Sequence, residues 1–199
     1  MNISVEKIGG TSMTRFDTIL KNVILNGKRT GRVFVVSAYS GITDLLLDNK
    51  KTKEPGVLSL FIQEKDYLSK LDETVERMIS LNRKFEILGL DLKASEYFIS
   101  SRVEIIKRYL NSITHIVKSG YIDQKELYSA AREVISALGE SHAAFNSANI
   151  INNRGFKALL VDLSGNDDGY NYTIDERIAA AFSGIDLSDQ IAIVTGYIK

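Results

Sequence analysis

The sequence predicts an α/β domain that is interrupted by a helical insertion. Short apolar runs suit buried parallel strands, and each is followed by a polar, glycine-containing loop and then by an amphipathic helical pattern. A long middle segment breaks this alternation, because its apolar residues recur only at helical spacing. The length of 199 residues fits one domain with one sizeable insertion.

The alternation begins at the first residues of the chain. Residues 3–8 predict a strand and residues 14–25 predict a helix, which Asn26 and Gly27 would end. Residues 32–37 contain the run VFVV, which is typical of a strand buried on both faces. A loop follows, and residues 42–48 predict the next helix.

The middle of the chain predicts long amphipathic helices over about residues 58–119. Its apolar residues recur three and four positions apart, as in Tyr97, Ile99, Val103, Ile106, Leu110, Ile113 and Val117. We interpret these residues as core packing, and His115 as an ordinary helix residue.

The α/β alternation resumes near Asp123. Residues 124–151 predict one long helix or two, and residues 158–161 a strand. Residues 173–182 predict a helix and residues 191–194 a last apolar strand, followed by Thr-Gly-Tyr.

Composition excludes several classes of function. Lys and Arg together number 25, as do Asp and Glu, so we expect no nucleic-acid partner. The absence of cysteine excludes disulfides, thiolate metal sites and a cysteine nucleophile, and it fits a reducing compartment. The N-terminus lacks signal-peptide features, and no apolar run approaches the length of a membrane span. We therefore expect a cytoplasmic protein without a membrane partner and without a dedicated metal cluster.

The first strand runs directly into Lys7, Gly9, Gly10, Thr11 and Ser12, a layout that suits phosphate binding. Glycine lets the backbone approach an anion, N–H groups at a helix start point toward it, and lysine supplies a mobile charge. The lysine precedes the glycines, so the segment is not a Walker motif. An ordinary strand-to-helix turn with a solvated lysine remains the alternative.

Polar residues follow three predicted strands, at 9–12, 37–43 and 195–197. Ligands bind beyond the carboxyl ends of strands in open α/β sheets, so these segments predict a site. A fourth cluster, Gly139-Glu140-Ser141, lies within a helical pattern, where glycine costs about 1 kcal/mol relative to alanine. Close packing or ligand access would explain that glycine, and so would a helix junction. We interpret His142 as a surface or packing residue.

Four of these segments resemble the motifs of aspartate kinases, in family order. KIGGTS at 7–12 resembles the opening K-F-G-G-T-S motif, and VSAYSGITDLL at 36–46 resembles the second motif. SALGE at 136–140 resembles S-x-G-E, and VTGYI at 194–198 resembles V-T-G-F-I. The sequence at 6–13 and 50–57 is similar to that of the divergent aspartate kinases found with ectoine biosynthesis genes. The resemblance covers essentially the whole chain.

The resemblance implies the three-layer α/β/α sandwich of the amino acid kinase fold with an all-helical insertion. It also implies transfer of the ATP γ-phosphoryl group to the β-carboxylate of L-aspartate, which gives 4-phospho-L-aspartate. That product feeds lysine, threonine and methionine synthesis, or ectoine synthesis. Mg²⁺ would arrive with the ATP phosphates, and the full-length protein would be a homodimer, often with ACT domains.

The resemblance also implies roles for individual residues. Lys7 would neutralise the γ-phosphoryl oxygens, the N–H groups of Gly9, Gly10 and Thr11 would cradle them, and Ser12 would add a hydroxyl contact. Ser37 and Thr43 would donate hydrogen bonds to aspartate, and Glu140 would hold its ammonium group. Tyr197 replaces the family's phenylalanine and would line the same pocket.

The resemblance implies that residues 1–199 are the N-terminal, substrate-binding part of such a domain. The family's later glycine- and serine-rich motif and its nucleotide-base site have no counterpart here, so we expect this chain alone to be inactive and to expose apolar surface. Another amino acid kinase fold phosphotransferase, or a non-catalytic aspartate-binding regulatory fragment, remains the alternative.

Overall fold

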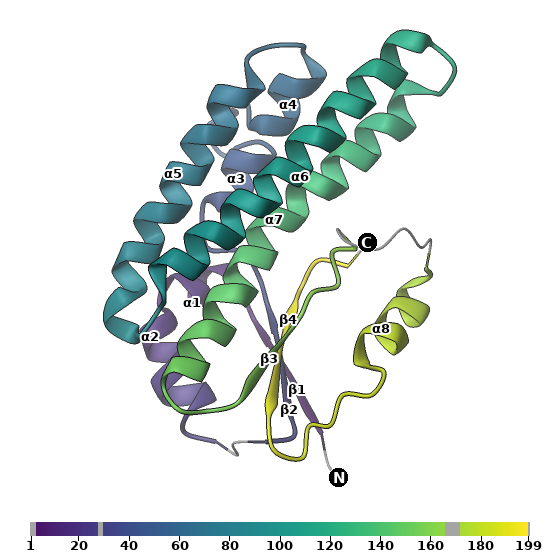
Figure 1. The fold of residues 1–199 in the computed structure, drawn as a ribbon. Helices are drawn as coiled ribbons and strands as arrows, with labels where there is room; N and C mark the ends of the chain where they lie inside the picture. The colour runs from purple at the N-terminus through teal and green to yellow at the C-terminus, as the bar shows by residue number, and fades with distance from the viewer. Residues whose placement is uncertain (1–2, 28–29, 166–171, 199) are drawn as a thin grey trace.

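A parallel sheet forms the centre of the molecule. The computed structural model describes residues 3–27, 30–165 and 172–198. Within these residues, the strands β1 (Ser4–Ile8), β2 (Arg32–Val36), β3 (Ala158–Val161) and β4 (Ile191–Thr195) pair in the order β1-β2-β4-β3. All pairs are parallel, so the carboxyl ends of the strands lie along one edge of the sheet (Figure 1).

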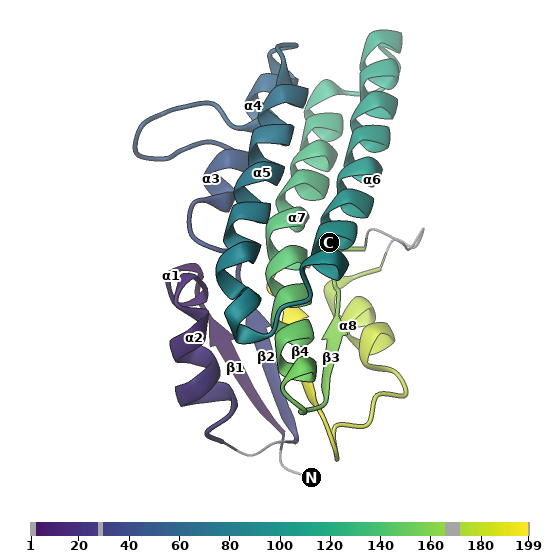
Figure 2. The ribbon, with the colours of Figure 1, turned by 60° about the vertical axis from the view of Figure 1, so that its left-hand side comes forward.

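Helices connect the strands on both faces of the sheet. The described helices are α1 (Gly10–Thr14), α2 (Phe16–Ile19), a π-helical turn (Leu20–Ile24), α3 (Ile42–Leu46), α4 (Val57–Ile62), α5 (Tyr67–Phe85), a 3₁₀ turn (Glu86–Leu88), α6 (Leu92–Ser119), α7 (Gln124–Asn153) and α8 (Ile174–Phe182). Helices α4 to α6 and the first half of α7 form a bundle that extends beyond the carboxyl edge of the sheet (Figure 2). The second half of α7 continues down across the sheet.

The sheet is the middle of three layers because its side chains alternate between two cores. Phe34 and Ile193 face the larger core, which they share with the helical bundle. Val33, Ala192 and Val194 face a smaller core that α8 covers. These layers match the α/β/α sandwich with a helical insertion that the sequence predicts.

The outer strand β1 is covered less completely than its neighbours. Val5 pairs with Val33, but its side chain is 69% exposed, and that of Ile3 is 55% exposed. Apolar surface is thus open on one face at this side of the sheet.

A partly buried ion pair fixes β1 to β2. The Arg32 guanidinium donates from Nε and Nη2 to the two carboxylate oxygens of Glu6, over 2.9 and 3.0 Å. Its Nη1 donates to the carbonyl oxygens of Val23 and Ile24, each at 3.0 Å, which ties down the end of the π-helical turn.

One element differs from the sequence-based expectations, and the structure decides two alternatives that the sequence left open. The predicted helix at 14–25 begins earlier, at Gly10, and is divided at Arg15, whose φ of −106° and ψ of 48° are not helical. Residues 124–151 form part of one continuous helix of 30 residues, so no junction divides α7 at Gly139. Of the two roles expected for His142, surface or packing, the structure shows packing, because this residue of α7 is fully buried.

Among the described residues, no helix combines the length and the apolar character that crossing a membrane requires.

Candidate active site at the carboxyl edge of the sheet

Hydrogen bonds beyond the strand ends hold three of the predicted loops side by side. The Ser37 N–H donates to the carbonyl oxygen of Ile8 at 3.1 Å, and the Gly196 N–H donates to that of Val36 at 2.9 Å. The segments after β1, β2 and β4 therefore start next to one another, as the sequence predicts.

Three glycines allow these segments to approach one another closely, two of them against Ala38. A Cβ added at Gly10 would lie 2.8 Å from the Ala38 oxygen, and one at Gly139 would lie 2.9 Å from the Ala38 Cβ. A Cβ at Gly196 would lie 3.0 Å from the Val36 oxygen and 3.1 Å from Oε2 of Glu140. The mid-helix glycine of α7 is therefore explained by close packing, which the sequence left open.

Glu140 carries a half-buried carboxylate at the centre of this arrangement. Desolvation raises the pKa of Glu140, while the Tyr197 N–H, the Lys7 ammonium and the Ala38 N–H oppose the rise. Its Oε2 is buried and has no hydrogen-bond partner among the described residues. A desolvated carboxylate oxygen without a donor is suited to bind a cationic ligand group.

The predicted phosphate-binding segment lies at the open side of the site. Lys7 and Thr11 are exposed and Ser12 is half-buried. A Cβ added at Gly9 would meet no described atom within 4 Å, so space is open beside the backbone here. The first N–H groups of α1 have no intrahelical acceptor and remain available to an anion.

Not every predicted residue contacts the others. Ser37 is half-buried at the start of its loop, next to the end of β1, whereas Thr43 is exposed in the first turn of α3. Neither Thr11 nor Ser12 has a side-chain hydrogen bond to another predicted site residue within the described ranges. Lys7 and Tyr197 interact with Glu140 instead: the Lys7 ammonium through charge, and Tyr197 through its backbone N–H and its hydroxyl group.

Tyr197 is half-buried beside Glu140. Burial and the nearby carboxylates of Glu133 and Glu140 raise the pKa of Tyr197 to about 12, and the Arg132 guanidinium opposes them. Thr195 Oγ1 donates to the Tyr197 carbonyl oxygen at 3.0 Å and fixes this turn.

Arg132 and Glu133 border the site, and the sequence did not single them out. Arg132 also faces Thr43 across a hollow of about 590 Å³, whose charged lining includes Asp44, Asp48, Lys50 and Lys53. No sequence motif distinguishes Arg132 and Glu133, because only the packing of α7 brings them to the site.

A further group at the edge was missed although a signal was present. Asp162 directly follows β3, the fourth strand end, and accepts a hydrogen bond from Arg102 of α6 at 2.7 Å. Its carboxylate also accepts from the Ser164 N–H at 2.9 Å and lies 3.4 Å from the Ser141 hydroxyl. Because Ser141 follows Glu140, Asp162 links the insertion to the site.

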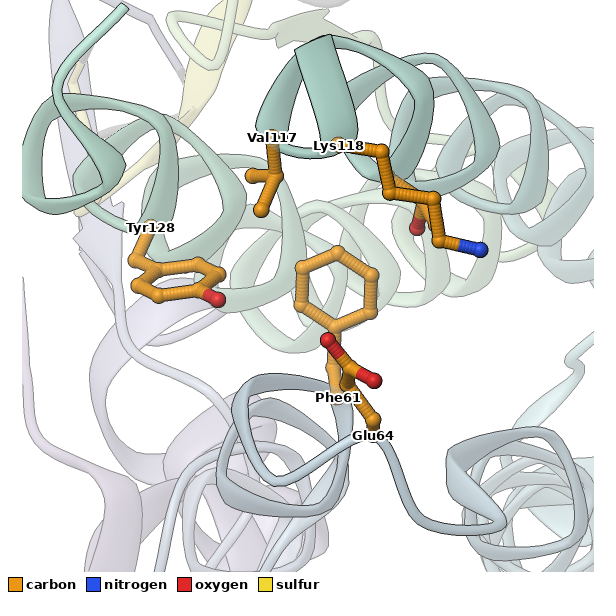
Figure 3. A pocket seen from close by; sticks show the side chains of 6 residues that line it. Phe61, Glu64, Val117, Lys118 and Tyr128 are labelled. Carbon is orange, nitrogen blue, oxygen red and sulfur yellow. The ribbon is translucent and has the colours of Figure 1, made fainter. Parts of the chain in front are cut away.

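A separate small hollow lies at the far end of the bundle and contains none of the predicted residues. Figure 3 shows Phe61 and Glu64 facing Val117, Lys118 and Tyr128 from the neighbouring helices. Its volume of about 20 Å³ holds little more than one water molecule, so we exclude it as a substrate site.

Comparison with known proteins identifies similar sequences and structures. No family model matches the chain. Over 202 aligned residues, it is 38% identical to the aspartate kinase Ask_Ect of Stutzerimonas stutzeri (strain A1501). The alignment covers 98% of this chain and 42% of that relative, so the chain spans less than half of the relative's length.

Solved structures share the fold. E. coli aspartokinase III in complex with lysine and aspartate has a TM-score of 0.56 and 20% identity, covering 97% of this chain and 40% of that one. The same enzyme in complex with aspartate and ADP has a TM-score of 0.55 and 21% identity, covering 98% and 40%.

The sandwich with its helical insertion is thus the fold of an amino acid kinase. Over nearly its whole length, the chain is similar in sequence to an aspartate kinase.

Proposed function

We propose that this chain is the substrate-binding part of an aspartate kinase, which transfers the ATP γ-phosphoryl group to the β-carboxylate of L-aspartate. The observation that carries the proposal is the half-buried Glu140 carboxylate, which interacts with the Lys7 ammonium and has one oxygen that finds no donor among the described residues. The relationship to an aspartate kinase supports the same reaction.

Glu140 would bind the ammonium group of the amino acid. An ammonium donor would satisfy the buried Oε2 and offset the desolvation that raises the pKa of this carboxylate. The half-buried Ser37 would donate a hydrogen bond to a substrate carboxylate, and Thr43 would do so from the rim. Tyr197 would close the pocket beside Glu140.

Lys7 would stabilise the charge on the transferred phosphoryl group. A carboxylate is already a nucleophile, so the reaction depends on positioning and on charge stabilisation rather than on a strong base. The open backbone at Gly9 and the first N–H groups of α1, from Gly10 to Ser12, would receive the phosphate oxygens.

ATP would bring its Mg²⁺ with it. The described residues contain no group of three or more His, Asp or Glu side chains that would hold a metal. Mg²⁺ usually keeps phosphate and water ligands, which makes such a protein cage unnecessary.

Further parts of the proposal concern the whole protein. Residues 1–199 would be one substrate-binding unit that includes the insertion at about 58–119, within a longer cytoplasmic chain that forms homodimers. By itself this unit would bind aspartate without turnover, since the relatives it matches are more than twice as long.

The test is ADP release by the complete gene product that contains this chain, with L-aspartate, with L-glutamate and without an acceptor. Lys7→Ala should lower kcat at least about 100-fold, because a charge that stabilises the transition state is lost. The exposed Lys125 supplies a matched control, and Lys125→Ala should stay within about twofold of the wild type. Release that ignores aspartate, or that survives in Lys7→Ala, would refute the proposal, and preference for glutamate would indicate another amino acid kinase.

A further inference from the structure

Four buried polar side chains form a closed cluster between helices α5, α6 and α7. Asn82 Nδ2 donates to Ser95 Oγ at 2.8 Å, and Ser95 Oγ donates to Asn146 Oδ1 at 2.6 Å. Asn146 Nδ2 donates in turn to Asn82 Oδ1 at 2.7 Å, which closes the ring of hydrogen bonds. All of these residues, and His142, have no exposed surface. We call Asn82, Ser95, His142 and Asn146 the polar cluster.

His142 joins the cluster through one ring nitrogen. Its Nε2 lies 2.8 Å from Asn82 Oδ1 and 2.9 Å from Asn146 Nδ2, so either neutral tautomer finds a partner there. Burial lowers the pKa of His142 to about 3, which keeps the ring neutral at working pH. The cluster therefore acts by geometry rather than by charge.

The same helix segment holds the substrate loop. Gly139 packs against Ala38, the Glu140 carboxylate faces the Ala38 N–H, and the His142 ring lies edge-on to Tyr39 at 5.3 Å. Tyr39 is 1% exposed and also packs against Phe85 at the end of α5. Three nearby residues of α7 thus contact two consecutive residues, Ala38 and Tyr39, of the loop that begins at Ser37.

We propose that His142 is a positioning residue for the amino acid substrate, through which the polar cluster sets Glu140 and the substrate loop relative to the helical insertion. This inference rests on the proposed function. Buried hydrogen bonds have strict geometry, so the cluster fixes the rotation and height of α7 against α5 and α6 more narrowly than apolar packing does. A small shift of α7 would move the Glu140 carboxylate relative to the Ala38 and Tyr197 N–H groups, and aspartate binding would weaken.

The test compares two substitutions of similar size in the complete gene product. His142→Gln keeps an amide at the place of Nε2, whereas His142→Leu removes every hydrogen bond there. We expect His142→Leu to raise KM for aspartate about tenfold, as expected from one buried hydrogen bond lost. KM for ATP should change less than about twofold, and His142→Gln should restore most of the aspartate affinity.

Leu110→Ala separates positioning from lost stability. Leu110 is fully buried on the same helix as Ser95 but 15 positions farther along, about 22 Å away. The substitution Leu110→Ala should lower the melting temperature at least as much as His142→Leu does, and it should leave KM for aspartate unchanged.

Ser95→Ala provides a milder variant if His142→Leu does not fold. Ser95 is on α6 and does not touch the site. A rise in KM for aspartate of about threefold would therefore come only from a change in the position of α7 and Glu140. The inference would be overturned if KM for aspartate were unchanged in whichever of His142→Leu and Ser95→Ala folds, or if it rose equally in Leu110→Ala. Either result would leave the proposed function standing. A wild type without aspartate-dependent ADP release would overturn the proposed function, and this inference with it.

Discussion

Glu140 combines a cost in stability with the binding role proposed above. Its carboxylate is half-buried, and desolvation outweighs the N–H groups and the ammonium that surround it. A desolvated carboxylate of this kind lowers the stability of the fold, and perturbed ionisable groups are common at functional sites.

Glu140→Gln should therefore raise the free energy of unfolding at neutral pH, by less than about 1 kcal/mol because the group is partly solvated. A raised native pKa means that the native state binds the proton more readily than the unfolded state. The stability of the wild type thus falls as pH rises from the ordinary carboxyl value through the native pKa. The advantage of Glu140→Gln should be full at pH 8 and disappear below about pH 4.5, which urea unfolding at several pH values measures.

The same substitution should raise KM for aspartate at least about tenfold, because a charge-assisted hydrogen bond is lost. Glu76 is exposed on α5 and supplies the control: Glu76→Gln should alter neither quantity. A stability gain in Glu140→Gln that persists at low pH would contradict the explanation by desolvation.

At the scale of elements, the contact between α7 and the loop after β2 depends on two small residues. A Cβ at Gly139 would lie 2.9 Å from the Ala38 Cβ and 3.2 Å from Ile42 Cγ2. Alanine favours a helix by about 1 kcal/mol, but overpacking costs about 1–3 kcal/mol.

We expect Gly139→Ala to destabilise the protein by about 1–2 kcal/mol and to weaken aspartate binding, since Glu140 is the next residue. Ala38→Gly removes the methyl group that the new Cβ would meet. In a double-mutant cycle monitored by urea unfolding, Ala38→Gly should recover part of the loss, with a coupling energy of at least about 0.5 kcal/mol. Strict additivity would show that the two residues do not compete for the same space.

Much of the element order follows from the sequence, and the reasons for the exceptions are tertiary. Apolar runs predict β2 and β4 to within a residue because strands buried on both faces need such runs. The division of the first helix at Arg15 has no local signal in the sequence. Next to it, Thr14 Oγ1 accepts a hydrogen bond at 3.2 Å from the N–H of Ser40, in the distant loop after β2.

Most of the predicted site lies at strand ends, although Asp162 at the end of β3 was missed. On helix α7, Glu140 was found through its family motif. The predicted segments after β1, β2 and β4 do meet, because parallel strands share one carboxyl edge. Arg132 and the polar cluster could not be predicted, since both depend on how α7 is rotated against its neighbours.

At the scale of the whole molecule, His142 sets a dependence of stability on acidity. Burial lowers its pKa in the native state to about 3, whereas the unfolded chain binds a proton near pH 6.5. The unfolded state therefore gains protons first as pH falls, and native stability drops between about pH 6.5 and pH 3.

His142→Gln should remove this slope, which amounts to at most about 1.4 kcal/mol per pH unit. We expect wild type and His142→Gln to diverge below pH 6.5 in urea unfolding, with the variant losing less stability. His115 is exposed, and His115→Gln should follow the wild-type curve. Parallel curves for the wild type and His142→Gln would mean that the native ring accepts the proton.

Helix α7 belongs to two layers at once, since it packs against α6 along the bundle and against β3 and β4 along the sheet. Because the helical bundle and the sheet share α7, we expect that neither can unfold without disrupting this helix and with it the other. The amide protons in the middle of α7 should therefore exchange with solvent only when the whole chain opens, and the insertion and the sheet should melt in a single cooperative transition.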